Sequence, residues 1–227
     1  MEDRKLIIKN FRKAYDEKTV LRDVNLSINS GQITGLLGAN GAGKTTLLKA
    51  VAGIHDYDEG EILFDGLNFK EHKYLSKDFG VLIESKFLNH LTGYENLKTL
   101  LMIDGVVNKR EMDEKIEYGL ELVGLMASKD VKVKNYSYGM RQRLDLAQAI
   151  LTARTFLILD EPFLGLDPVG KGIVKNAIEK KASDGIPIIL SSHDLADVNE
   201  MCHKIIVIKN QTVHYEGNIQ HKYEYDI

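Results

Sequence analysis

A glycine-rich loop followed by lysine and threonine is the stretch of this sequence best suited to chemistry. It reads Gly-Ala-Asn-Gly-Ala-Gly-Lys-Thr-Thr at 38–46, between the apolar run 33–37 and apolar residues at helical spacing. Glycines allow backbone N–H groups to surround an anion with no Cβ in the way, and the helix N-terminus adds partial positive charge. The pattern favours a nucleoside triphosphate site over an ordinary strand-to-helix turn. Its predicted ligands are Gly38, Asn40, Gly41, Ala42, Gly43, Lys44, Thr45 and Thr46, with Lys44 on the terminal phosphates and Thr45 on Mg²⁺.

Two adjacent acids form the second group that could do chemistry. Asp160 and Glu161 follow the apolar run 156–159, which is typical of a buried strand. Beside a phosphate loop, an aspartate at such a strand end holds Mg²⁺, directly or through water. The neighbouring Glu161 could accept a proton from an attacking water. The alternative is a pair of surface acids at the start of a turn, and the phosphate loop argues against it.

Two further residues could touch a nucleotide. His193 ends another predicted strand and could stabilise charge on the terminal phosphate. Tyr15 could stack on an adenine, although one tyrosine in a turn is ordinary. The remaining histidines are expected to be structural, because none has the spacing of a zinc ligand: His55, His72, His90, His203, His214 and His221.

Residues 136–143 combine Ser137, Gly139 and a helix start. A helix N-terminus with a serine and a glycine can bind an anion. The chain has no second phosphate loop, so this segment could meet a nucleotide held by another copy of the protein. The pattern fits a plain capped helix equally well.

Apolar runs separated by helical patterns position these groups. We expect strands at 6–8, 20–28, 33–37, 61–66, 79–83, 156–159, 186–190, 205–208 and 212–215, with a polar turn at 11–16. We expect helices after 46, at 96–102 behind a Thr92–Glu95 capping box, at 112–123, from Ser137, at 169–177 and at 195–198. This alternation predicts an α/β fold with a parallel sheet and ligands at the strands' carboxyl ends. The polar tail 221–227 is expected to be loosely ordered.

Composition narrows the classes of protein. The 227 residues are 44% hydrophobic with a net charge of -3, which supports a real core and argues against a nucleic-acid partner. The single cysteine, Cys202, excludes an internal disulfide. We find no signal peptide and no apolar run near the roughly 18 residues of a membrane span. We therefore expect a soluble, cytoplasmic protein, in which any membrane role comes through a partner.

The order of these motifs resembles the ATP-binding subunit of ABC transporters over the whole chain, 1–227, as a single ATP-binding domain. Tyr15 matches the aromatic A-loop, 38–46 the Walker A loop, 137–140 the signature motif and 157–160 the Walker B strand. Glu161 matches the catalytic base, residues 165–168 the D-loop with Asp167, and His193 the switch histidine.

The resemblance implies a P-loop NTPase fold. It would have a mostly parallel core sheet, an N-terminal antiparallel β part, and a helical subdomain at about 85–153 carrying the signature. It also implies ATP and Mg²⁺ as cofactors and a homodimer of head-to-tail subunits. ATP would lie between one Walker A loop and the partner's Ser137 and Gly139, and hydrolysis would drive a separate permease. The subunit would be peripheral on the inner face of the cell membrane, touching the membrane only through that permease. Phe87 and Leu88 lie where the family touches its permease, or equally in the core.

Three residues depart from the family's usual pattern. Glu84 stands where glutamine is usual, and its carboxylate could bind Mg²⁺ together with Thr45 and Asp160. In the signature, Tyr138 replaces a glycine, so its ring must avoid the phosphate, and Met140 replaces a glutamine. Residues 82–85, 91–97 and 137–144 resemble the bacitracin-resistance and lantibiotic-immunity branch, which exports peptide antibiotics. The alternatives are an importer subunit and an ATP-driven binding switch without transport.

Overall fold

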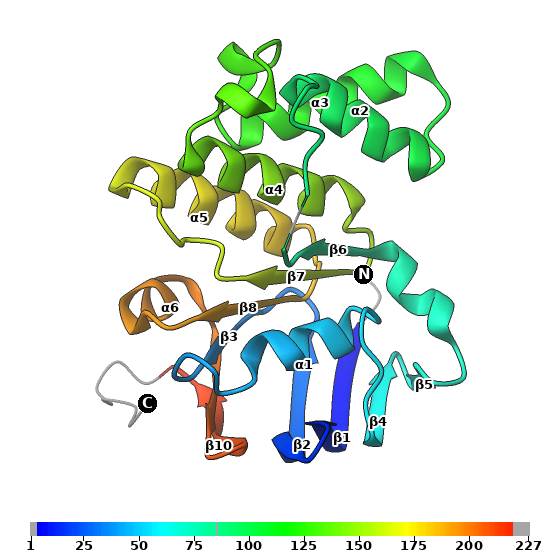
Figure 1. Ribbon diagram of the computed structural model, residues 1–227, viewed down its shortest axis with the longest axis vertical. Helices are drawn as coiled ribbons and strands as arrows, with labels where there is room; N and C mark the ends of the chain where they lie inside the picture. The colour runs from blue at the N-terminus through cyan, green and yellow to red at the C-terminus, as the bar shows by residue number, and fades with distance from the viewer. Residues whose placement is uncertain (1–3, 85, 220–227) are drawn as a thin grey trace.

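The computed structural model describes residues 4–84 and 86–219, and it contains two β-sheets. The N-terminal sheet is antiparallel, with strand order β2-β1-β4-β5. Its strands are β1 (Lys5–Tyr15), β2 (Lys18–Asn29), β4 (Glu59–Phe64) and β5 (Leu67–Asn68). β1, β2 and β4 stand side by side at the lower edge of Figure 1. The antiparallel N-terminal part expected from the family resemblance is therefore present.

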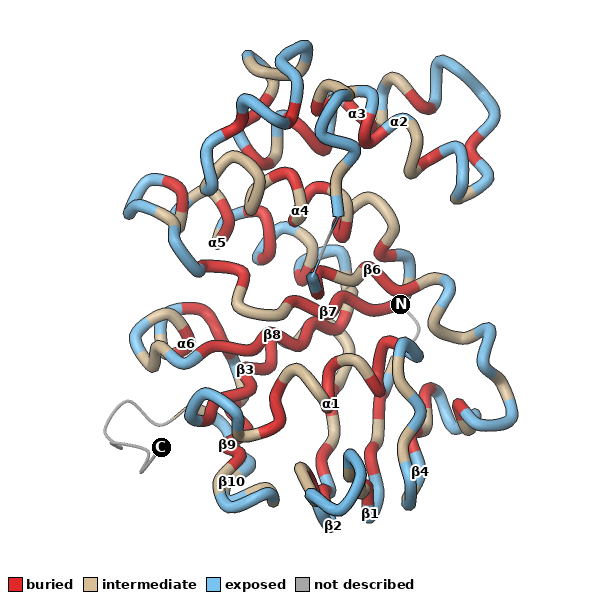
Figure 2. Tube along the Cα trace, viewed as in Figure 1, coloured by how far each residue is buried: buried red, intermediate tan, exposed pale blue. Residues whose placement is uncertain are grey.

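The core sheet has strand order β10-β9-β3-β8-β7-β6 and is parallel except for the antiparallel strand β10. Its strands are β3 (Ile33–Leu37), β6 (Phe79–Leu82), β7 (Phe156–Asp160), β8 (Ile188–Ser192), β9 (Lys204–Lys209) and β10 (Thr212–Asn218). Figure 2 shows the middle strands as a continuous buried band. Strands covered on both faces read as uninterrupted apolar runs, which explains why these were visible in the sequence.

Helices cover the core sheet on both faces (Figure 1). They are α1 (Lys44–Val51), α2 (Gly93–Ile103), α3 (Lys109–Leu122), α4 (Tyr138–Thr152), α5 (Pro168–Ser183) and α6 (Leu195–Met201), with 3₁₀ turns at Lys73–Asp78, Met126–Ser128 and Val133–Asn135. Side chains alternate across the sheet. Leu157 and Leu159 of β7 pack in one cluster with α2–α6, whereas Phe156 and Ile158 pack in the other with α1 and the antiparallel sheet. The predicted α/β fold class is confirmed.

N-cap side chains fix the starts of five helices in the described part, and three of these lie next to the predicted site segments. Thr92 accepts from the Glu95 N–H at 3.1 Å and Glu95 caps the Thr92 N–H in return, as the sequence predicted. Ser137 caps α4 through the Met140 N–H at 3.2 Å. Asp167 caps α5 through the Gly170 N–H at 2.7 Å, with Pro168 in the first turn.

The predicted polar turn at 11–16 is wrong, because residues up to Tyr15 continue β1. Phe11 is fully buried and packs on the ring of Tyr57, with centroids 5.3 Å apart. Register shifts after Ile8 and after Phe11 break the alternation of the strand, which made it resemble a turn in the sequence. The tail at 221–227 lies outside the described residues. Among the helices of the described part, none is long and apolar enough to cross a membrane.

Gly80 allows α4 to lie directly on β6, and its replacement should destabilise the fold. A Cβ at this position would lie 1.9 Å from the Ala149 carbonyl oxygen and 2.6 Å from the Ala153 Cβ. We expect Gly80→Ala to lower the free energy of unfolding by about 3 kcal/mol. Gly172→Ala is the matched control, because nothing lies within 4 Å of its added Cβ in α5. The control should gain about 0.5 kcal/mol. Equal urea midpoints for the two variants would contradict this account of the α4–β6 contact.

Candidate functional site

Backbone carbonyl groups of the glycine-rich loop bind the ammonium group of Lys44. Lys44 Nζ donates to the carbonyl oxygens of Gly38 at 2.6 Å and Ala39 at 3.3 Å. Gly43 has φ 103, and a Cβ there would lie 2.8 Å from Leu21 Cδ2, so only glycine fits the turn into α1. Burial lowers the pKa of Lys44, while the charges of Glu161 and Asp160 act in the opposite direction. The loop therefore holds an ammonium group at the N-terminus of a helix, a natural place for an anion.

Asp160 is fixed by two hydroxyl groups. Thr45 Oγ1 donates to Asp160 Oδ2 at 2.7 Å, and Ser191 Oγ donates to the other carboxylate oxygen, Oδ1. Ser191 also accepts from the Glu161 N–H at 2.9 Å. Asp160 and Ser191 face each other in the parallel register of β7 and β8. The hydroxyl and carboxylate of Thr45 and Asp160 thus meet at the carboxyl end of the sheet.

These two oxygen donors suit Mg²⁺. This ion prefers hard oxygen ligands and usually takes only one or two from the protein, with phosphate and water completing the shell. Within residues 4–84 and 86–219, no group of three or more His, Cys, Asp or Glu side chains is arranged to hold a metal. The donor set fits a metal that is shared with a phosphate better than a closed protein cage.

Glu161 lies between the phosphate loop and His193. Its Oε2 is 2.9 Å from His193 Nδ1, and its Oε1 is 3.9 Å from Lys44 Nζ. Its carbonyl oxygen accepts from Gln142 Nε2 at 3.2 Å. The backbone of Glu161 has φ 49, a left-handed conformation that is costly for a non-glycine residue and common at functional sites. The three predicted catalytic side chains, Lys44, Glu161 and His193, are therefore together.

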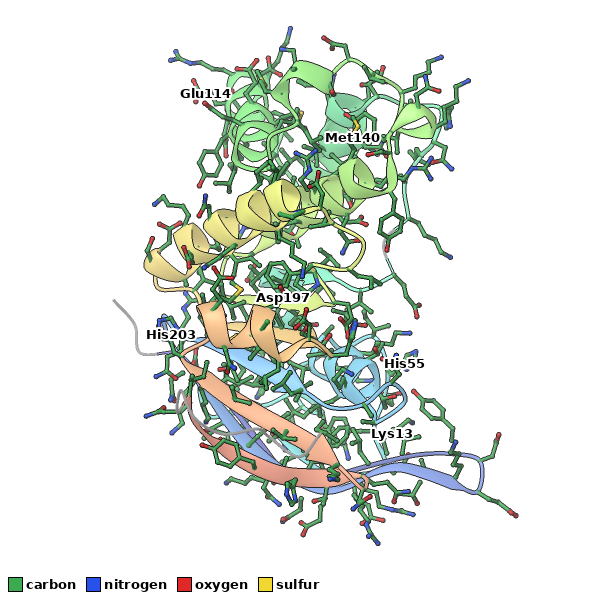
Figure 3. The ribbon with its side chains drawn as sticks, turned by 90° about the vertical axis from the view of Figure 1, so that its left-hand side faces the viewer. Lys13, His55, Glu114, Met140, Asp197 and His203 are labelled. Atoms are coloured by element: carbon green, nitrogen blue, oxygen red, sulfur yellow. The ribbon has the colours of Figure 1, made fainter. Side chains whose placement is uncertain are left out.

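Tyr15 lies beside the same loop. It lines a cleft of about 910 Å³ together with Asn40, Gly41 and Ala42. Its hydroxyl is 2.9 Å from His55 Nδ1, and Lys13 Nζ is 4.9 Å from the centre of its ring. Figure 3 shows Lys13 and His55 on the same edge of the molecule. The cleft beside the loop is wide enough for a nucleoside, with an aromatic face in its wall.

Glu84 has a partner that the sequence analysis did not anticipate. Its Oε1 is 2.8 Å from Nζ of Lys49, and this hydrogen bond, with the charge of Lys49, lowers the pKa of the carboxyl. The Glu84 side chain is 73% exposed. It borders a second cleft of about 740 Å³ that Asp160 and Glu161 also line. Glu84 is thus at the edge of the site, bound to Lys49, and its role toward Mg²⁺ stays a prediction.

The signature segment lies apart from the loop. Figure 3 places Met140 high in the helical part, well above His55 and Lys13, which both contact Tyr15. The ring of Tyr138 lies against Gly165, where an added Cβ would be 2.4 Å from the ring. Gly139 has the side chain of Leu166 as its neighbour, 3.3 Å from an added Cβ. Tyr138 therefore packs on residues 165–168, the segment that contains Asp167.

Sequence reasoning missed four residues that contact the predicted ones. They are Ser191 on Asp160, Lys49 on Glu84, His55 on Tyr15 and Gln142 on Glu161. The sequence holds one signal for Ser191 and one for Lys49. Ser191 lies near the end of β8, beside Asp160 in the neighbouring strand, and Lys49 lies four residues after Thr45, on the same face of α1.

Comparisons with known proteins agree with this geometry. The family model described as "ABC transporter" matches residues 21–164. The bacitracin transport ATP-binding protein BcrA of Enterococcus faecalis is 38% identical over 213 residues, 92% of this chain and 68% of the relative. The lantibiotic transport ATP-binding protein SrtF of Streptococcus pyogenes is 35% identical over 221 residues, 97% of this chain and 91% of the relative.

A solved structure described as a dimeric bacterial ABC transporter cassette has the same fold. Its TM-score is 0.86 at 23% sequence identity, and the match covers 95% of this chain and 99% of that one. The sequence matches reach far enough along the chain to decide its family. The chain belongs to the ABC transporter family, as an ATP-binding subunit and an ATPase.

Proposed function

We propose that this ATPase powers a separate membrane permease that exports a lantibiotic or a similar peptide antibiotic. The observation that carries the proposal is the match to two proteins named for bacitracin and lantibiotic transport, over 92% and 97% of this chain. Residues 82–85, 91–97 and 137–144 support the same branch through their resemblance to it. Cells make such transporters to protect themselves, so the proposed role is resistance or immunity.

The geometry supports a division of labour for ATP hydrolysis. Lys44 and the loop amides bind the β- and γ-phosphates, and Thr45 and Asp160 hold Mg²⁺, which neutralises phosphate charge when bound. Glu161 takes a proton from the attacking water, since its carboxylate lies 3.9 Å from the lysine that marks the terminal phosphate. His193, 2.9 Å from Glu161, orients that carboxylate and donates toward the γ-phosphate.

A second copy of the chain completes the site in this proposal. Ser137 and Gly139 begin a 15-residue helix whose N-terminus carries partial positive charge. Neither residue lines the cleft that Tyr15 and the phosphate loop of the same chain form, and Met140 in the same turn stands well above His55 in Figure 3, which supports contact with a nucleotide on a partner. Asp167 and the rest of 165–168 would lie at the same interface. Residues 1–227 would form one ATP-binding domain in each copy.

Antibiotic sensitivity tests the proposed export directly. Disrupting the gene should make the source cell several-fold more sensitive to at least one lantibiotic or bacitracin-like peptide, because export lowers the peptide concentration at the membrane. The measurement is the minimal inhibitory concentration over a panel of such peptides. The wild-type chain should restore resistance, and the Glu161→Gln chain should not.

Two other results would overturn the proposal in favour of its alternatives. Unchanged inhibitory concentrations with loss of uptake of a nutrient would indicate an importer. Unchanged concentrations with no membrane protein recovered alongside the affinity-purified chain would indicate an ATP-driven switch without transport. Purification from detergent-solubilised membranes should instead recover one multispanning permease.

A further inference from the structure

Helix α1 reaches two neighbouring strand ends from a single face. Thr45 and Lys49 are four residues apart, so their side chains lie one above the other on the helix. Thr45 donates to Asp160 at the end of β7, and Lys49 donates to Glu84 just after β6 at 2.8 Å. β6 and β7 are paired in parallel, with Leu82 beside Leu159. The helix that begins in the phosphate loop is therefore tied to both strand ends.

The two side chains of the Lys49–Glu84 contact differ in their exposure to solvent. The Lys49 side chain is only 15% exposed, whereas that of Glu84 is 73% exposed. Glu84 has φ 50, a left-handed backbone that turns the chain sharply away from β6. His55 and Lys86 also act on Glu84, and both have weaker effects than Lys49. The partly buried lysine thus fixes the direction of a carboxylate at the mouth of the site.

A carboxylate at this place needs a compensating charge. Glu84 shares a cleft with Asp160 and Glu161, so three acids line the space beside the phosphate loop. Like charges repel one another, so an uncompensated Glu84 carboxylate would oppose both the neighbouring acids and the phosphates of ATP. An amide at the Glu84 position would not add to this repulsion. One ammonium at 2.8 Å cancels most of it.

We propose that Lys49 is a positioning residue that neutralises Glu84. The Lys49–Glu84 pair then adds no net charge beside the nucleotide phosphates, as a neutral side chain at position 84 would. Lys49 keeps the Glu84 carboxylate bound to α1 and reduces its repulsion of the incoming triphosphate. The pair links the phosphate loop to the segment after β6 through a charge contact. This inference needs only ATP binding at residues 38–46 and does not depend on the cargo or on the direction of transport.

Metal-free ATP binding tests the proposal through four proteins: wild type, Lys49→Met, Glu84→Gln and the double variant. The probe is ATP in excess EDTA, which prevents a metal from competing with Lys49 for Glu84, and the readout is the dissociation constant by titration calorimetry. Lys49→Met should weaken ATP binding about fivefold, because it leaves the Glu84 carboxylate without a compensating charge. Removing the carboxylate as well, in the double variant, should restore wild-type affinity within about twofold.

Two controls separate positioning from a general defect. Lys175→Met breaks a comparable pair, Lys175–Glu200 at 2.6 Å between α5 and α6, and should leave ATP affinity unchanged. Lys49→Arg keeps the charge and should bind ATP as the wild type does. Thermal melting identifies any variant that fails to fold.

The effect of Lys49→Met on ATP affinity, compared between proteins with and without the Glu84 carboxylate, decides the outcome. An equal loss from Lys49→Met in the wild-type and Glu84→Gln backgrounds would show that Lys49 acts on the phosphates or the fold by itself. No loss in either background would show that the pair has no influence on the nucleotide. Either result overturns the proposal, whereas a loss confined to the background with Glu84 supports it.

Discussion

Glu161→Gln should abolish ATP turnover and leave ATP binding intact. The substitution preserves the size and shape of a side chain that contacts His193 at 2.9 Å and lies 3.9 Å from Lys44. It removes the carboxylate that would accept the proton of the attacking water. A general base contributes roughly 10²- to 10⁴-fold, so kcat should fall at least about 100-fold. Steady-state phosphate release measures kcat, and equilibrium binding of a fluorescent ATP analogue measures affinity.

The same variant should accumulate as an ATP-bound dimer, because hydrolysis would no longer reopen it. Size-exclusion chromatography with and without ATP shows the change in mass. Glu114→Gln is the matched control, since Glu114 is an exposed residue of α3 whose partner is Arg110 (Figure 3). It should match wild type in both assays. A Glu161→Gln protein that hydrolyses ATP at the wild-type rate would remove the assignment of the base.

Sequence patterns predicted the fold well wherever an element is determined by residues that are close together in the chain. The buried strands of the core sheet are apolar on both faces, so runs such as 156–159 stand out without knowledge of their neighbours. The helix starts at Thr92 and Ser137 were predictable because capping involves residues only three positions apart. β1 was partly missed, because its register shifts interrupt the alternation on which a strand prediction depends.

The site was predictable in its motifs and not in its contacts. Lys44, Asp160, Glu161 and His193 could be chosen from their types and places after predicted strands. The spacing of Thr45 and Lys49 predicts that they share a face of α1, but it does not show that Glu84 lies within reach of that face. Lys49 is an ordinary helix residue until the fold places its Nζ 2.8 Å from a carboxylate 35 positions away.

Lys44→Ala and Gly139→Asp should each remove almost all ATPase activity, for different reasons. Lys44→Ala removes the ammonium at the phosphate loop, and ATP affinity should fall along with kcat. Gly139→Asp adds a carboxylate where the partner's phosphate is expected, while an aspartate in the first turn of α4 favours the helix. Its own phosphate loop is unchanged, so it should bind ATP normally and fail to hydrolyse it.

Mixing these two inactive proteins measures most directly whether each site is shared between two copies. In a head-to-tail dimer of one Lys44→Ala chain and one Gly139→Asp chain, one site carries both lesions and the other carries neither. Random pairing makes about half of the dimers mixed, so the mixture should recover roughly a quarter of the wild-type phosphate-release rate. If the mixture is as inactive as each variant alone, the site is not completed by a second copy in the manner proposed.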